Sequence, residues 1–202
     1  MASTENLSET RRNQILEAAS NVFSRKGLQK ARMDDIVTES GLSKGALYWY
    51  FKSKDDIIIA ILKRFLEREL DLFRTLVHSE GSAEDRLRQM VERVLADLKG
   101  LEYFRAIAYE FYSMAMRSKK IRALFSGYMG EYMDITRPII EQGIRDGEFR
   151  DLDPTDVAIA LGAILEGTFL IYSFAPDMVD FGTHIHQGMD LLLTGLKKPE
   201  DN

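Results

Sequence analysis

The stretch that decides the fold is Ile36–Phe51, which reads IVTESGLSKGALYWYF. It contains two short helical segments joined by a turn at Gly41, and Leu42 and Leu47 can pack one segment against the other. Glycine accepts the positive backbone angle that a tight turn needs, and Ser43 is a good N-cap for the second segment. This arrangement is typical of a helix-turn-helix, in which one helix braces another in the major groove of DNA. Two short helices around a glycine also occur without DNA binding, so the spacing alone leaves both alternatives open.

The residues before this stretch predict the helix against which the pair packs. Residues 8–26 have a helical pattern that ends at Gly27, where a C-terminal glycine is expected. Residues 33–40 and 44–51 are the two helices of the pair. The apolar stripe of the first helix consists of Ile15, Ala18, Ala19, Val22 and Phe23.

The rest of the chain also has helical periodicity, with four prolines and almost no strand-like alternation. Ser53 predicts the start of a long helix that reaches about His78, because serine caps well and two acidic residues lie in the first turn. The predicted fold class is therefore all-α, with a three-helix N-terminal domain (residues 1–53) and a helical C-terminal domain (residues 54–202). Further helices are expected at about 82–100, 102–117, 119–146, 155–174 and 179–197.

Charge is distributed unevenly along the chain. Residues 1–54 contain nine Lys/Arg and six Asp/Glu, a balance of +3, whereas residues 55–202 contain 18 and 26, a balance of −8. Contacts to phosphate are local, because the Debye length in ordinary salt is about 8–10 Å. The net charge of −5 therefore permits DNA binding by the N-terminal part.

Small residues and hydrogen-bond donors gather at the start of the second helix of the pair. Gly45 and Ala46 allow the backbone to approach base edges closely, and Lys44 can reach a phosphate or a guanine. Further donors directed toward phosphates are Tyr48, Trp49, Lys52 and Lys54.

The aromatic run Tyr48–Phe51 covers every direction of a helix. The simplest interpretation is that the whole run is core. We expect instead that Phe51, together with Tyr50, is buried with Leu47, and that Tyr48 and Trp49 face outward. An exposed tryptophan beside lysines is uncommon without a partner.

A longer pattern runs through the N-terminal quarter of the chain. It consists of Ile15–Ala19 (ILEAA), Phe23, Gly27, Asp35–Val37 (DIV), Gly41–Tyr48 (GLSKGALY) and Tyr50–Lys54 (YFKSK). From Ser8 to about Ile58 the chain thereby resembles the DNA-binding region of the tetracycline-repressor (TetR) family. The resemblance implies a recognition helix that begins at Ser43 and a helix from Lys54 that links it to a sensor domain. It also implies a repressor, less often an activator, that works as a symmetric dimer with an effector-binding C-terminal domain.

Three positions depart from the family pattern. Ala31 and Arg32 stand where a threonine or serine usually caps the second helix and touches phosphate, and Arg32 can replace the phosphate contact but not the cap. Ala46 replaces the usual threonine, which removes one hydrogen bond and offers a methyl group to thymine. Trp49 stands where histidine is frequent. These differences affect which operator is read, rather than whether DNA is bound.

Aromatic and methionine side chains are dense between Tyr103 and Met133. The simple interpretation is the core of a helical bundle. The functional interpretation is a pocket with rigid walls, adaptable methionines and a few polar anchors such as Arg105 or Glu110. Such a pocket predicts a small lipophilic or aromatic effector that releases the repressor from DNA. The residues expected to bind it are Phe65, Phe104, Phe111, Met114, Tyr128, Tyr132 and Phe169.

The helix expected at 155–174 is apolar nearly all round, so it must be buried on both sides. Pairing it with the helix at 179–197 suggests a four-helix interface across a two-fold axis, as the resemblance also implies. The alternative is a core helix of a monomer. The predicted partners are therefore a second copy of the chain, a pseudo-palindromic double-stranded DNA operator and a small-molecule effector. The expected dimer contacts are Ala160, Ala163, Ile164, Gly167, Met189 and Leu192.

Enzymatic and metal chemistry have little support. No cysteine occurs, which excludes disulfides and thiolate metal sites. His184 and His186 diverge on a helix, and no catalytic signature or phosphate-binding glycine loop is evident, so we expect no enzyme, no cofactor and no metal. The alternative function is a helical ligand-binding or enzymatic protein whose N-terminal helices are structural only.

The sequence shows no pattern typical of a signal peptide or a membrane-spanning helix. The first six residues are polar, unlike a signal peptide. The longest apolar stretch, Val157–Leu165, is shorter than a membrane-spanning helix requires. We therefore expect a cytoplasmic protein without a membrane partner.

Overall fold

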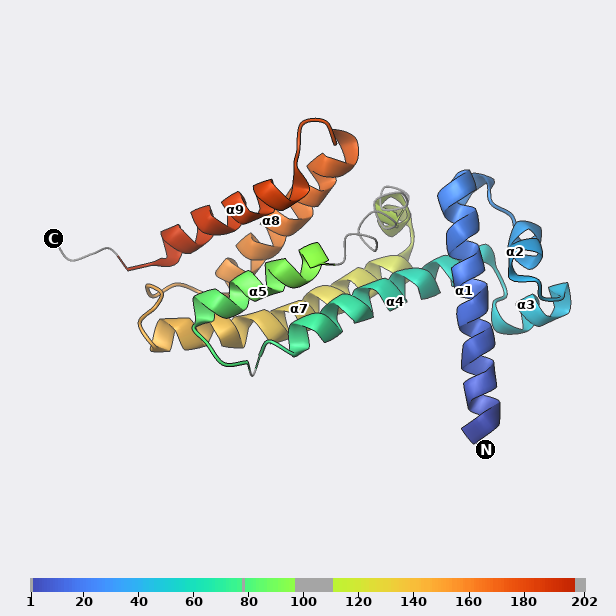
Figure 1. Cartoon of the computed structure of the whole chain (residues 1–202), viewed down its shortest axis with the longest axis horizontal. Helices are drawn as coiled ribbons and strands as arrows, with labels where there is room; N and C mark the ends of the chain where they lie inside the picture. The colour runs from blue at the N-terminus through green and yellow to red at the C-terminus, as the bar shows by residue number, and fades with distance from the viewer. Residues whose placement is uncertain (1, 78, 97–110, 199–202) are drawn as a thin grey trace. The chain divides into compact units, whose positions relative to one another are not determined.

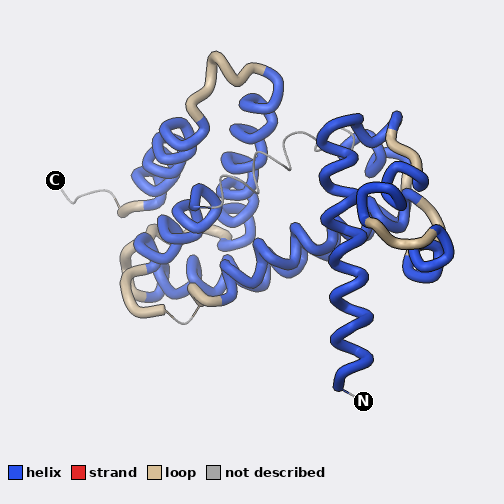
Figure 2. Tube along the Cα trace, turned by 45° about the vertical axis from the view of Figure 1, so that its right-hand side comes forward, coloured by secondary structure: helices blue, strands red, loops and turns tan. Residues whose placement is uncertain are grey.

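The computed structural model describes residues 2–77, 79–96 and 111–198, and these residues are almost entirely helical (Figures 1 and 2). Within them no β-strand occurs, apart from one isolated bridge between Phe149 and Lys197. The all-α prediction is confirmed. Residues 111–117 are also helical. The helices with defined bounds are α1 (Ala2–Lys30), α2 (Met33–Ser40), α3 (Lys44–Tyr50), α4 (Lys54–Arg74), α5 (Ala83–Ala96), α7 (Lys119–Arg145), α8 (Pro154–Phe174) and α9 (Phe181–Leu196).

The described residues divide into two compact units. The first contains residues 2–66 and 111–124, and the second contains residues 67–77, 79–96 and 125–198. The helices α4 and α7 each contribute to both units. This division is based on which residues pack together. The domain boundary expected after Ser53 remains a prediction.

In the first unit, α1 carries the core and α2 and α3 pack beside it (Figure 1). The five residues of the predicted apolar stripe are all buried, as are Ile36 of α2 and Leu47 of α3. Gly27 has φ 75° and interrupts the helical geometry of α1, as expected of a glycine that ends a helix. Gly41 has φ 67° in the turn between α2 and α3, which confirms the predicted positive angle.

Helix starts carry capping side chains, including the predicted caps Ser43 and Ser53. Each cap accepts a hydrogen bond from a backbone N–H in the first turn, one of the four that a helix leaves unpaired. The long α4 ends at Arg74, earlier than the predicted end at about His78, and a turn at residues 75–77 follows it. The capping bonds are Ser43 to Ala46 (3.1 Å), Ser53 to Asp56 (3.1 Å), Ser82 to Asp85 (3.0 Å), Asp153 to Thr155 (2.7 Å) and Asp180 to Thr183 (2.7 Å).

In the second unit, α8 and α9 pack closely against each other, and α9 also packs against α5. The α8–α9 contact depends on Gly188, because a Cβ added there would lie 2.7 Å from Cγ2 of Ile164. Phe169 of α8 packs edge-on against Phe181 at the start of α9, with ring centroids 6.1 Å apart.

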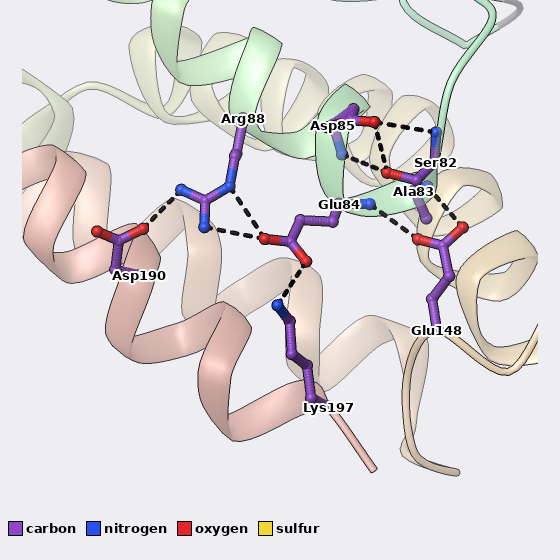
Figure 3. A network of polar contacts seen from close by, with 8 residues as sticks. All are labelled: Ser82, Ala83, Glu84, Asp85, Arg88, Glu148, Asp190 and Lys197. Atoms are coloured by element: carbon purple, nitrogen blue, oxygen red, sulfur yellow. Dashed lines mark hydrogen bonds and ion pairs between the residues drawn. The ribbon is translucent and has the colours of Figure 1, made fainter.

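A polar network fixes α5 to its neighbours in the second unit (Figure 3). Arg88 donates to Asp190 of α9 (2.6 Å) and to Glu84 within α5 (2.9 and 3.1 Å). Glu84 also pairs with Lys197, just after α9, at 3.0 Å. Glu148 caps α5 by accepting from the N–H groups of Ala83 and Glu84, so α5 is held at its start and along its length.

Many apolar side chains of α8 remain exposed within one copy of the chain. An 18-residue window of α8 has a mean hydropathy of 1.8, and 22% of that window is buried. By length and composition α8 is long and apolar enough to cross a membrane, because its apolar character continues beyond Glu166. One such helix indicates a membrane only weakly, since a helix that packs against another chain has a similar composition.

Candidate nucleic-acid interface

The exposed face of α3 carries the side chains that the sequence predicts to meet DNA. Ser43, Lys44 and Gly45 are exposed at its start, and Ala46 is partly exposed. A Cβ at Gly45 would meet only the Ser43 hydroxyl, at 4.0 Å, so among the described residues nothing else covers the backbone there. The start of α3 is therefore open to close approach by a base edge.

The aromatic run divides as predicted. Phe51 is buried, with the guanidinium of Arg12 5.4 Å from its ring centroid, and Tyr50 is partly buried. Trp49 is 67% exposed, and Tyr48 is also exposed. The Trp49 ring meets Tyr50 edge-on at 4.5 Å between centroids, which gives the indole a defined position on the surface.

Lys44 has an acidic partner that the sequence analysis missed. Its ammonium lies 2.7 Å from Oδ1 of Asp34, in the first turn of α2. The hydrogen bond that Lys44 donates to the Asp34 carboxylate raises the pKa of Lys44, so the ammonium stays charged at neutral pH. No local signal points to this pair, because the two residues are ten positions apart and meet only when α2 folds beside α3.

Two lysines near the end of α3 bind backbone carbonyls of their own chain. Lys52 donates to the carbonyl of Tyr48 at 2.8 Å. Lys54 donates to the carbonyls of Leu28, Gln29 and Ala31, at 2.5, 3.3 and 3.0 Å. The Lys54 ammonium thus satisfies carbonyls at the C-terminal end of α1, and its phosphate contact remains a prediction.

Arg32 is the exposed N-cap residue of α2, and its side chain makes no capping hydrogen bond. Asp35 compensates by accepting from the Arg32 backbone N–H at 2.9 Å. This outcome agrees with the expectation that arginine cannot replace the usual hydroxyl cap. A hydrogen bond from Lys26 and the Arg32 N–H lower the pKa of Asp35, so it remains a carboxylate.

The predicted effector residues do not all fall in one unit. Phe65, Phe111 and Met114 belong to the first unit, where Phe111 is buried and the other two are partly buried. Tyr128, Tyr132 and Phe169 belong to the second unit. Phe104 lies outside the described residues.

Two tyrosines of α7 carry the polar groups of the predicted effector region in the second unit. Tyr128 donates to Oε2 of Glu69 at 3.0 Å, and burial, followed by the charge of Glu69, raises its pKa. Tyr132 is buried, donates to the carbonyl of Ala158 at 3.2 Å and meets Phe73 edge-on. Tyr132 and Phe169 therefore serve as core residues whatever else they bind.

The predicted dimer contacts also differ in exposure. Ala163 is exposed, and Ala160, Ile164 and Gly167 are partly exposed on α8. On α9, Leu192 is partly exposed, whereas Met189 is buried within its own chain. The sequence analysis missed the most exposed large apolar residues of α8, α9 and the loop between them, because periodicity cannot choose a face on a helix that is apolar all round. These are Ile159, Leu170, Ile171 and Phe174 of α8, Met178 of the following loop and Leu191 of α9.

Among the described residues, no group of three or more His, Asp or Glu side chains lies together as a metal site would require. The arrangement has instead the features of a regulator: an exposed helix of a helix-turn-helix in one unit and an exposed apolar helix pair in the other.

Comparisons with known proteins agree with this class. Residues 15–61 match the model of bacterial regulatory proteins of the tetR family, and residues 83–196 match the C-terminal domain of BetI-type transcriptional repressors. The second match covers more than half of the chain, which belongs to the TetR family of transcriptional regulators. The chain is thus a DNA-binding regulator with a helical sensor domain.

Individual relatives are similar over most of the chain. The uncharacterized regulator YfiR of Bacillus subtilis is 29% identical over 156 residues, which are 75% of this chain and 74% of YfiR. A transcriptional regulator from Saccharomonospora viridis, solved with choline, has a TM-score of 0.83 at 24% identity and covers 95% of this chain and 100% of its own. FadR of Bacillus subtilis, solved with stearoyl-CoA, has a TM-score of 0.76 at 20% identity and covers 91% and 98%. These two likenesses show a shared fold.

Proposed function

We propose that the protein is a homodimeric repressor that reads a pseudo-palindromic operator with α3 and is released by a small effector. The observation that carries this proposal is the open start of α3, with Lys44 and Gly45 exposed and Trp49 67% exposed beside them. An exposed glycine beside an exposed lysine and tryptophan allows the helix backbone to approach the major groove of DNA closely. Because the partner is DNA, we place the protein in the cytoplasm, without a membrane partner.

The proposed dimer forms through α8 and α9. The exposed apolar residues of α8 recur at helical spacing along one face, from Ile159 through Ala163 and Leu170 to Phe174. Leu191 of α9 is 78% exposed, so α9 contributes to the same kind of surface. Covering these residues with a second copy removes apolar area from water at about 25 cal/mol per Å². A two-fold axis then presents two α3 helices to two half-sites, about ten base pairs apart or a multiple of that.

For the effector we propose a small, largely apolar molecule recognised in part by α7 of the second unit. Tyr128 and Glu69 supply a hydroxyl and a carboxylate, and Phe73, Tyr132 and Phe169 supply apolar walls. The structural neighbours were solved with ligands as different as choline and stearoyl-CoA. We therefore specify the class, lipophilic or aromatic, and not the compound.

The proposed coupling element is α4. It runs unbroken from Lys54 to Arg74, about 30 Å at 1.5 Å per residue, and includes residues of both units. An effector that shifts the later part of this helix changes the distance between the two recognition helices. Effector and operator then oppose each other equally, with a coupling of about 1–3 kcal/mol.

The test starts with selection of DNA fragments by the purified protein and sequencing of what is retained. A pseudo-palindromic site supports the proposal, and Trp49 fluorescence should change when that duplex is added. Retention of no preferred sequence, with unchanged fluorescence, would favour a protein whose N-terminal helices are structural only.

The effector is tested on the same preparation. Mass spectrometry identifies what co-purifies with the protein, and operator affinity is then measured with and without that compound. The reciprocal measurement, compound affinity with and without operator, must give the same coupling factor. Tight binding of a compound that leaves operator affinity unchanged would refute release by that compound.

A further inference from the structure

Two buried polar atoms in the core of the second unit have no hydrogen-bond partner among the described residues. They are Nε of Arg86, on α5, and Oγ1 of Thr136, on α7. Arg86 is 8% exposed, and Thr136 is completely buried. Buried polar atoms without partners are rare in folded proteins, so each of these two requires an explanation.

Arg86 carries a charge that its surroundings do not neutralise. Within the described part of the chain, its side chain makes a single hydrogen bond, from Nη1 to the carbonyl of Val77 at 3.2 Å, and no ion pair. The carboxylates next to it in the sequence are engaged elsewhere, because Glu84 pairs with two cations and Asp85 accepts from the N-cap of α5. A guanidinium stays protonated in proteins. Burying it without an anion is costly, so this position favours an anion.

The two unpartnered atoms lie at the same level of the helical bundle. In the second unit α4 and α7 run side by side in the same direction (Figure 1), and the ring of Tyr132 meets Phe73 edge-on. One helical turn beyond this contact, Thr136 follows on α7 and Val77 follows α4. The Val77 carbonyl is the group that holds Arg86. The guanidinium and the threonine hydroxyl are therefore both one turn beyond the aromatic contact.

The Thr136 hydroxyl is also close to the region proposed for the effector. Burial raises the pKa of the Tyr132 phenol, and the nearby Thr136 hydroxyl lowers it in part, although the two form no hydrogen bond. Tyr132 donates instead to the carbonyl of Ala158 on α8. The unpartnered hydroxyl thus lies beside an aromatic side chain that we assign to the effector region.

We propose that Arg86 and Thr136 bind a carboxylate of the effector, so that the effector is an organic acid with an apolar body. The inference rests on the proposed function and narrows its effector class. The guanidinium can present Nε–H and a terminal N–H to the two carboxylate oxygens, and the threonine hydroxyl can donate a further hydrogen bond. Phe73 and Tyr132 then border the apolar body one turn away. A carboxylate in this position neutralises the buried charge and satisfies both unpartnered atoms.

The experiment compares matched probes that differ only in their charged end. Straight-chain carboxylates from hexanoate to dodecanoate, and the primary alcohols of the same lengths, are titrated into the purified protein by isothermal titration calorimetry. The variants are Arg86→Met and Thr136→Val. Arg93→Met is the matched control, because it removes an exposed cation from the same helix. Thermal unfolding of each protein is measured without ligand.

The wild type should bind at least one acid about tenfold or more tightly than the matching alcohol, because hydrogen bonds to charged groups are the strong ones. Arg86→Met should lose this preference and Thr136→Val should reduce it, whereas Arg93→Met should keep it. Without ligand, Arg86→Met should unfold at the same temperature as the wild type or a higher one, because an apolar side chain replaces a buried unpaired charge. An arginine that serves only the fold would give a lower unfolding temperature.

Two outcomes would overturn the proposal. One is a wild type that binds no acid more tightly than its alcohol, which would assign the two polar atoms to bound water. The other is a preference for acids that survives in both Arg86→Met and Thr136→Val.

Operator affinity separates this inference from the proposed function. An acid that binds through Arg86 but leaves operator affinity unchanged would support the carboxylate site and refute release by that acid. Release from the operator by a compound without an acidic group, equally in the wild type and Arg86→Met, would support the proposed function and overturn the carboxylate site.

Discussion

The two units of the molecule differ in the sequence separation of the residues that determine their structure. These residues are neighbours in the first unit and lie far apart in the sequence in the second. In the first unit, the turn between α2 and α3 depends on Gly41 and on Ser43, which caps the helix that begins at the next residue. In the second unit, the contact between α8 and α9 depends on Gly188 and Ile164, which are 24 positions apart in the sequence. A short-range signal predicts the position of a helix, whereas the choice of the buried face of an apolar helix is made by distant partners.

This difference accounts for which functional surfaces were found from the sequence. The face of α3 follows from caps, a glycine and the order of four aromatic residues. The face of α8 does not, because nearly every position along that helix is apolar. Variants that change one unit and leave the other intact can test this difference. They show whether the faces of α3 and α8 also have separate functions.

The largest effect is expected from Gly167→Glu on α8. A Cβ at this position would have no neighbour within 4 Å in the part of the chain that the structure describes, so the new side chain can be accommodated there. In the proposed dimer the carboxylate would be placed in an apolar interface, where an unpaired charge is costly. We expect monomers by sedimentation and a loss of operator affinity of about a hundredfold, because a second half-site no longer contributes.

The matched control is Gly127→Glu on α7, another helical glycine with no neighbour within 4 Å of an added Cβ. It should remain dimeric and bind operator as the wild type does. Intact dimers for Gly167→Glu would move the interface away from α8.

The sequence predicts the features that depend on neighbouring residues and misses those that depend on distant partners. Ser43 and Ser53 mark helix starts because each cap interacts with the residue three positions away. Met189 was expected at an interface and is buried in its own chain instead, because leucine and methionine positions on α9 are indistinguishable until α8 and α5 pack against it. Tertiary packing, and not periodicity, separates the two roles.

Electrostatic partners were similarly beyond sequence reasoning. The sequence predicts that Lys44 and Lys54 contact DNA, and it indicates no partner for either within the chain. The structure gives Lys44 a carboxylate from α2 and gives Lys54 three carbonyls from α1 and the residues after it. Both sets of partners are separated from the lysine by ten or more residues and have no signature in the local pattern.

An intermediate effect is expected from Lys54→Met, which keeps much of the aliphatic stem and removes the ammonium. Hydrogen bonds to a charged donor are worth about 1.5–3 kcal/mol. We expect the free energy of unfolding to fall by about 2 kcal/mol, measured by urea denaturation. Because the carbonyls hold the ammonium, the salt slope of operator binding should change by less than the value of about 0.9 for one phosphate contact.

Lys52→Met provides the comparison for Lys54→Met, because Lys52 is exposed and donates to a single carbonyl within its own helical turn. Its loss should leave stability nearly unchanged. If Lys54→Met has wild-type stability and a lower salt slope, the result would support the phosphate contact that the sequence predicts for Lys54.

The smallest effect is expected from Asp34→Asn, which removes the carboxylate that holds Lys44. In the free protein the ammonium lies 2.7 Å from Oδ1 of Asp34, so a phosphate or guanine must compete with that carboxylate. Both side chains are largely exposed, and exposed ion pairs are weak, so release of Lys44 should raise DNA affinity only about two- to fivefold. The gain should be similar for operator and unrelated duplexes when Lys44 meets phosphate, and larger for operator when it meets a guanine. Asp55→Asn is the control, because it makes the same change in net charge at an exposed position in the first turn of α4. An equal rise in affinity for Asp55→Asn would assign the effect to net charge and leave the Asp34–Lys44 pair without a role in DNA binding.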